Sequence, residues 1–351
     1  MKINSIKKLV AIFLFSFLLP TNSSAQYLND KDLERNFSEI DILRSNDKEY
    51  TKYKDPFVFF LKSNKNLAFY LNKDNLLYNY ELTFIDDYSF NPIKTEKLGI
   101  PNNSILEFAD ENKVFYRHQL NFYTYEFSNQ SIKRINNDQT TIFKFWPLNE
   151  TSALCLGNIS EPDSEQNDFG FFIYDFEKQV VLDKQKVLHR SKENNSLRNY
   201  LKYIGDFDIN GDLISYNYDF YGKLVFFDSS KGEFRFEITT IDKVQPPQIA
   251  YFADTYTYKR GWTFFSNSGC FVRDDKLYVF SCRPNDLSKI IIDSYSIETK
   301  GYLQSYQVDF QNKNSSEIKF VSSSNKDNEL ILGFSNFFKG FNLNLEKIKL
   351  D

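Results

Sequence analysis

A four-part strand pattern recurs along this chain and limits the folds that it can adopt more than any other feature. Each copy begins with an apolar stretch, a short polar turn and a second apolar stretch, which predicts a pair of antiparallel strands. We label these strands A and B. The six A–B pairs are Phe57–Leu61 with Leu67–Leu71, Ile105–Phe108 with Val114–Arg117, Ile142–Pro147 with Ala153–Leu156, Tyr203–Phe207 with Leu213–Tyr218, Cys270–Arg273 with Leu277–Ser281, and Ile318–Val321 with Leu330–Phe334.

A second hairpin follows most of these pairs and supplies strands C and D. These hairpins are Phe122–Phe127 with Ile132–Ile135, Phe169–Phe176 with Val180–Val187, Gly222–Phe227 with Phe234–Ile238, and Ile290–Ile297 with Tyr302–Val308. Four-stranded units that repeat every ~40–50 residues are typical of propeller blades. The pattern therefore predicts an all-β chain that forms a six-bladed β-propeller of four-stranded antiparallel blades.

The two ends of the repeat array suggest how the ring closes. The last unit is incomplete, because only Gly340–Leu345 remains to form its third strand. Near the start, Phe37–Leu43 is a segment of about one strand's length without a partner. An N-terminal strand that completes the last blade would cover its open edge. We therefore predict closure by Phe37–Leu43, with a short helix that begins at Asp32 as the alternative.

This repeat architecture resembles that of the TolB-like six-bladed propellers, many of which are exported bacterial proteins. The resemblance covers residues 37–351 and rests on degenerate four-stranded units without Trp-Asp or kelch signatures. That family includes both binding proteins and enzymes, so the resemblance implies a fold more than a function. It carries over no functional residue.

The N-terminal segment predicts export. Three lysines accompany the apolar run Leu9–Leu19, and Ser23-Ser24-Ala25 supplies small residues where a signal peptidase cleaves. We expect a signal peptide at 1–25, a lead-in at 26–36 and the propeller domain at 37–351. The first cysteine is Cys155, so we do not expect a lipid-anchored protein. The expected location is periplasmic or extracellular.

Composition narrows the classes of partner and chemistry. The net charge is −4 without a basic stripe, which argues against nucleic acid as a partner. Beyond the N-terminal run, no segment is apolar enough to enter a membrane. The chain has two histidines and none of the common nucleophile, zinc or phosphate-loop motifs. We expect a monomer without a cofactor and without predicted catalytic residues.

Cys270 and Cys282 are not expected to form a disulfide. Cys270 and Cys282 are close in sequence, but a hairpin that turns at Asp274-Asp275 pairs Cys270 with Val279. Cys282 then lies three residues further along, and an odd offset places the two side chains on opposite faces.

One segment resembles the opening of a calcium loop. Its weak candidate ligands alternate with other residues and are Asp206, Asp208, Asn210 and Asp212. The bidentate glutamate of an EF-hand is missing, because Asn217 occupies that position. The segment also lies where other units have A–B turns, and Asn210-Gly211 favours a type I′ turn. We therefore interpret it as a structural hairpin.

The longest connections indicate where a partner would bind. Because strand direction alternates, B–C loops and D–A connections share one face. The three longest are Gly157–Asp168, Asp242–Gly269 and Cys282–Lys289. Insertions on one face of a repeat protein often mark its binding face.

The D–A connection also supplies the candidate binding residues, which are Arg260, Trp262, Tyr256 and Tyr258. The alternative is that these rings only pack onto a blade. We predict an exported, non-catalytic binding module for a protein or glycan. The competing prediction is a propeller hydrolase or lyase with carboxylates at the central channel.

Overall fold

The computed structural model describes residues 50–53, 58–63, 67–72, 80–85, 92–101, 103–119, 121–138, 140–160, 166–192, 196–259, 267–281, 289–309, 316–323, 329–336 and 342–349. The predicted signal peptide and the segment Phe37–Leu43 lie outside these ranges. Almost every described element is a strand, as the alternating apolar pattern predicts. Within the described ranges, no helix is both long and apolar enough to cross a membrane.

Most strands belong to four-stranded antiparallel units, which confirms that part of the prediction. Two such units are β2 (Val58–Ser63), β3 (Leu67–Asn72), β4 (Tyr80–Ile85) and β5 (Pro92–Leu98), then β6 (Ile105–Ala109), β7 (Lys113–His118), β8 (Asn121–Glu126) and β9 (Ile132–Arg134). The next two are β10 (Thr140–Pro147), β11 (Ser152–Ser160), β12 (Asn167–Asp175) and β13 (Val180–Ser191), then β14 (Gly205–Asn210), β15 (Leu213–Tyr218), β16 (Lys223–Asp228) and β17 (Phe234–Thr239).

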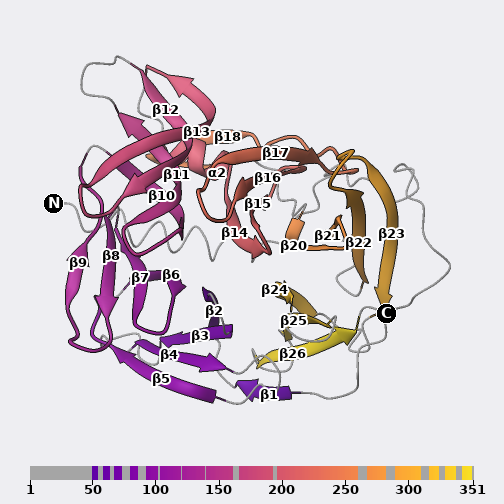
Figure 1. Ribbon diagram of the computed structural model, residues 1–351, viewed down its shortest axis with the longest axis horizontal. Coiled ribbons are helices and arrows are strands. Elements are labelled where there is room, and N and C mark those ends of the chain that lie inside the picture. Colours follow the sequence, from indigo (N-terminus) through magenta and orange to yellow (C-terminus); the bar gives the residue numbers. More distant parts are fainter. Residues whose placement is uncertain are drawn as a thin grey trace.

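The remaining strands complete the arrangement. They are β20 (Asn267–Arg273), β21 (Lys276–Ser281), β22 (Lys289–Ser296) and β23 (Tyr302–Asp309), then β24 (Ser316–Ser323), β25 (Glu329–Asn336), β26 (Asn342–Lys349) and β1 (Tyr50–Tyr53). Two insertions stand between units, namely helix α2 (Ser196–Lys202) and the hairpin of β18 (Ile249–Phe252) and β19 (Thr255–Tyr258). Figure 1 shows the units arranged around a common centre, with the first strand of each nearest the middle.

The N-terminal strand at the edge of the last sheet differs from the predicted one. The sheet order is β1-β26-β25-β24, and Tyr50 pairs with Leu345 while Tyr53 pairs with Leu343. An edge accepts one strand, so the position predicted for Phe37–Leu43 is held by residues further along the chain. The first two units also join, because β2 pairs in parallel with β6 at Lys62↔Phe108.

One-residue register shifts recur in the inner and outer strands of these units. Inner strands β6, β10, β20 and β24 each skip one residue in their ladders, at Glu107, Phe143, Ser268 and Lys319 respectively. Outer strands β5, β17 and β23 skip Ile93, Arg235 and Leu303, and β13 skips three residues. Such bulges bend a strand and increase its twist.

Aromatic side chains fill the space between neighbouring units. Phe115 of β7 contacts Phe145 of β10 with ring centroids 4.9 Å apart. Phe171 of β12 lies 4.9 Å from Phe227 of β16, across the next junction. The rings meet edge-on or tilted, as aromatic quadrupoles favour. Many of the phenylalanine and tyrosine side chains of this chain therefore pack between neighbouring sheets.

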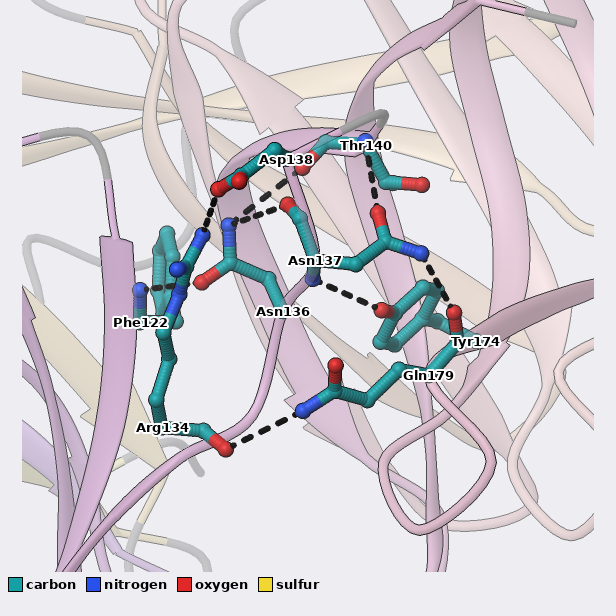
Figure 2. A network of polar contacts seen from close by, with 8 residues as sticks. All are labelled: Phe122, Arg134, Asn136, Asn137, Asp138, Thr140, Tyr174 and Gln179. Atoms are coloured by element: carbon teal, nitrogen blue, oxygen red, sulfur yellow. Dashed lines mark hydrogen bonds and ion pairs between the residues drawn. The ribbon is translucent and has the colours of Figure 1, made fainter. Parts of the chain in front are cut away.

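Side-chain amides add a polar junction between the β6–β9 unit and the β10–β13 sheet (Figure 2). Asn136, in the connection after β9, accepts a hydrogen bond from the N–H of Phe122 at 2.8 Å. Asn137 donates from Nδ2 to the carbonyl of Gln179 at 2.6 Å. Its N–H donates to the hydroxyl of Tyr174 at 3.3 Å. These bonds fix the path of a connection that forms no ladder of its own.

Candidate functional site

Connections from successive units come together on one face of the molecule. The Tyr258 hydroxyl of β19 donates to the carbonyl of Leu201 in α2 at 3.1 Å. The same ring lies edge-on to Phe220, in the β15–β16 loop, with centroids 5.1 Å apart. Two D–A connections and one B–C loop therefore share a face, in agreement with the alternation of strand direction. We call α2, the β15–β16 loop and the β18–β19 hairpin the loop face.

Parts of the three predicted long loops belong to strands, so the loops are shorter than predicted. In Gly157–Asp168, Gly157–Ser160 continues β11 and Asn167 begins β12. The ladder extends because Asn158 pairs with Phe169. Gly157 is needed there, since a Cβ would lie 2.0 Å from the carbonyl oxygen of Thr141. In Asp242–Gly269, the last three residues belong to β20. In Cys282–Lys289, Lys289 begins β22 and the rest lies outside the described residues.

The β18–β19 hairpin is the most prominent feature of the loop face. Ala253 and Asp254 form its turn with φ values of 50° and 60°. Two central residues with positive φ define a type I′ turn, whose twist matches that of paired strands. The ladder runs from Phe252↔Thr255 at the turn to Ile249↔Tyr258 at the base, without a register shift. The hairpin is therefore regular despite having neither glycine nor asparagine in its turn.

Two large side chains project from the tip of this hairpin. Tyr251 is 65% exposed and Phe252 is 72% exposed, more than any other large hydrophobic residue of the described chain. Tyr251 leans edge-on against Tyr256, with centroids 5.2 Å apart. Because successive residues of a strand point to opposite faces, the rings of Tyr251 and Phe252 project in different directions.

The four predicted binding residues differ in where they lie in the structure. Tyr258 faces inward and holds the hairpin onto α2, and burial raises the pKa of its hydroxyl, so it remains a hydrogen-bond donor. Tyr256 is half-buried beside Tyr251. Arg260 and Trp262 lie outside the described residues. A role in partner binding stays a prediction for all four. Tyr251 and Phe252 were not selected from the sequence.

A charged cluster joins the inner strands of three units near the loop face. Lys144 of β10 places Nζ 2.7 Å from Oδ1 of Asp206 in β14 and 3.2 Å from Oε2 of Glu107 in β6. Arg117 Nε lies 3.4 Å from the other oxygen of Glu107. Burial alone would lower the pKa of Lys144, but the two carboxylates raise it well above its usual value. Lys144 is therefore charged.

Helix α2 brings Tyr200 to this cluster. Tyr200 stacks on Phe143 with centroids 4.5 Å apart and planes 9° from parallel. Burial raises the pKa of its hydroxyl, although the charges of Lys144 and Arg117 oppose that effect. In this arrangement, each carboxylate already acts as the counter-ion of a cation. Carboxylates paired in this way are better suited to holding neighbouring units together than to transferring protons.

The segment with weak calcium signals forms a hairpin, whose turn is one residue later than predicted. Asn210 pairs with Leu213, so the turn residues are Gly211 and Asp212. Positive φ at Gly211 alone (64°) fits type II′ and not type I′. Asn210 points inward, where it donates to Ser215 Oγ at 3.1 Å. Asp206 is paired with Lys144. No group of metal-ligating residues occurs within the described ranges.

The predicted cysteine geometry is confirmed as far as the described chain extends. Cys270 pairs with Val279, and Asp274 and Asp275 form the turn with φ values of 49° and 57°. Cys155 and Cys270 are both buried. Cys282 lies outside the described residues.

Comparisons with known proteins show distant structural likeness. No protein-family model matches the sequence. No curated protein sequence matches it either. A protein of Bacteroides fragilis NCTC 9343 that is described as exported aligns with 13% identity and a TM-score of 0.48, covering 88% of this chain and 94% of that one.

Two further solved structures are similar. The protein KlHsv2, with its loop 6CD replaced by a Gly-Ser linker, aligns with 8% identity and a TM-score of 0.40, covering 85% of this chain and 99% of that one. BamB from Moraxella catarrhalis aligns with 7% identity and a TM-score of 0.38, covering 87% and 98%. Likenesses this distant say nothing about function.

Proposed function

We propose that this chain is an exported, non-catalytic binding module built on a closed six-bladed β-propeller of the TolB-like kind. The four-stranded units around a common centre support the architecture. The pairing of N-terminal β1 with β26 supports closure. The lysines and the apolar run at the N-terminus support export.

One observation carries the binding function. Tyr251 and Phe252 are exposed at the tip of a hairpin that Tyr258 anchors to α2. Exposed aromatic rings cost free energy in water unless they contact something else. Aromatic anchors also dominate binding energy at protein interfaces. Because the hairpin is already ordered by its ladder and its anchor, little conformational entropy is lost when a partner binds.

The geometry of the tip favours a protein partner over a glycan. A sugar ring stacks on one flat aromatic face. Here two adjacent rings lie on opposite faces of β18, and Tyr256 meets Tyr251 at 63°. A projecting tip of this shape fits a concave protein surface that surrounds it. A glycan partner is the other outcome that the experiment distinguishes.

The charged cluster favours binding over the alternative of catalysis. Glu107 is 5% exposed and contacts both Lys144 and Arg117. Asp206 contacts Lys144 as well. A general acid or base needs a proton that it can exchange with substrate, whereas these carboxylates form ion pairs with Lys144 and Arg117.

The test replaces both exposed rings in the mature protein. The double variant Tyr251→Ser/Phe252→Ser and the wild type are each used to capture proteins from an extract of the native host and to screen a glycan array. Leu182→Ser is the matched control, because Leu182 is also largely exposed but lies on β13. We expect a specific protein that the wild type and the control retain and the double variant loses. Equal capture by all three proteins would refute the proposal, and ring-dependent glycan binding would change the partner class.

A further inference from the structure

Within the described residues, one edge of strand β18 has no neighbouring strand. The N–H of Lys259 donates to the carbonyl of Gln248 at 2.8 Å, so these two residues form a hydrogen-bonded pair. Hydrogen-bonded and non-hydrogen-bonded pairs alternate in an antiparallel ladder. Ile249 and Tyr251 are therefore in non-hydrogen-bonded pairs, and their N–H and C=O groups point away from β19. No described residue forms a backbone hydrogen bond with them.

The described outer strands of the four-stranded units carry a bulge or charges. Outer strands β5, β13, β17 and β23 each skip at least one residue, and so does β1. Outer strand β9 has three residues, of which Lys133 and Arg134 are charged. Bulges, charges and short length are the means by which proteins prevent strands from adding to their edges.

β18 is short, but it has neither a bulge nor a charge. Its sequence is Ile249-Ala250-Tyr251-Phe252, without a charge, and its register with β19 is continuous. The strand also carries the two most exposed large hydrophobic residues of the described chain. An exposed, regular, uncharged edge strand accepts an added strand readily.

We propose that β18 binds an extended segment of a partner protein as a third antiparallel strand. This inference deepens the proposed function and rests on it. The outward N–H and C=O groups of Ile249 and Tyr251 would supply backbone hydrogen bonds. Tyr251 and Phe252 would contact alternate side chains on the two faces of the added strand. The partner segment would carry apolar residues at alternate positions and no proline.

The experiment separates backbone recognition from side-chain recognition. A phage library of random twelve-residue peptides is selected on the wild-type mature protein, and affinities of enriched peptides are measured by fluorescence polarisation. Tyr251→Pro removes the outward N–H, and Tyr251→Ala is its matched control because both variants lose the ring. Proline is tolerated where an edge N–H faces solvent. As a test that leaves the protein unchanged, enriched peptides are also made with alternate backbone amides N-methylated.

We expect the enriched peptides to have apolar residues at alternate positions. They should bind Tyr251→Pro at least tenfold more weakly than Tyr251→Ala. N-methylation of one of the two alternate sets of peptide amides should weaken binding by a similar factor, and methylation of the other set should not. Equal binding to both variants together with indifference to N-methylation would overturn strand addition. If Phe252→Ser still weakened the binding of those peptides, the proposed binding function would survive that result. Failure to enrich any peptide would also overturn strand addition, while capture by the tip would remain open to the ring-replacement experiment.

Discussion

At the scale of single residues, backbone bulges explain why three of the exposed apolar side chains face water. Ile93 (56% exposed), Leu182 (53%) and Leu303 (42%) are each the residue that an outer strand skips in its ladder. A skipped residue is not held in the alternation of the strand, so its side chain can turn outward. Their exposure is a consequence of edge protection and does not identify a binding surface.

Four C–D turns within the described residues share a second residue-scale feature. Each of the four contains a residue with positive φ at an equivalent place, namely Gln130 (56°), Gln179 (55°), Gly232 (72°) and Lys300 (60°). Only Gly232 adopts that conformation without a steric penalty from a Cβ. The three other turns therefore contain local strain.

Replacing Gln130 by glycine should relieve this strain. Gln130 is exposed, so the loss of its side chain costs little. We expect Gln130→Gly to raise the free energy of unfolding by up to about 1 kcal/mol, measured by urea denaturation. Gln130→Ala keeps the Cβ and is expected to change stability little. A glycine variant that is less stable than the alanine variant would contradict this account.

Asp168 gives a residue-scale prediction about pH. Its carboxylate accepts hydrogen bonds from Arg190 Nε at 2.7 Å and from Lys184 Nζ at 2.9 Å. The Arg190 bond is the main cause that lowers the pKa of Asp168 below its usual 3.8, burial opposes it, and Lys184 adds to the lowering. A lowered folded-state pKa contributes stability that is present above pH 3.8 and is lost as pH falls through the folded-state pKa.

We expect Asp168→Asn to lose that contribution. The variant should be less stable than the wild type at pH 6, and the difference should shrink as pH falls from 4 toward 2. Urea unfolding at several pH values measures both curves. A difference that stays constant over this range would show that the charge of Asp168 does not stabilise the fold.

At the scale of elements, local chemistry decided which parts could be predicted from sequence. The Asp274-Asp275 turn was predicted correctly because flanking strands and turn residues agree locally. The turn near Asn210 was predicted one residue early, since Asn210 finds better hydrogen bonds inside, including one from the N–H of Val272 at 3.2 Å. The β18–β19 hairpin was missed because Ala253-Asp254 is not a typical type I′ pair.

The charged cluster could not be predicted, because three separate units supply its members. Helix α2 has seven residues and no acidic residue in its first turn, so its sequence gives a weak helix signal. Its position is set instead by stacking of Tyr200 on Phe143. The sequence therefore pointed to the connection that contains the β18–β19 hairpin, but not to the hairpin or to the charged cluster.

Replacing Lys144 should weaken the contacts between three units. Lys144→Met leaves the buried carboxylate of Glu107 with Arg117 alone, and we expect a loss of about 3 kcal/mol in the free energy of unfolding. The double variant Lys144→Met/Glu107→Gln should recover part of that loss, because it removes the uncompensated charge. Calorimetry of these two variants and of the single variant Glu107→Gln measures the coupling. Strictly additive effects would mean that the ion pair contributes nothing.

At the scale of the whole molecule, β1 links the two ends of the chain. Without it, β26 would be an exposed edge. We expect a chain that begins at Lys54 to melt several degrees lower than one that begins at Glu49 and to self-associate as concentration rises. A chain that begins at Glu49 retains β1 and serves as the control. Identical melting and a monomeric state for both would show that β1 does not protect the edge.

The pairing of Tyr50 with Leu345 also sets an order of events during folding. Neighbouring units can form as soon as each is synthesised, because their strands are close in sequence. The β1–β26 ladder must wait for nearly the whole chain, and its loop-closure entropy is the largest among the described ladders. We therefore expect the final refolding step to be slow relative to strand formation within units. Until that step, the N-terminal strand and the last unit both present unpaired edges to other chains.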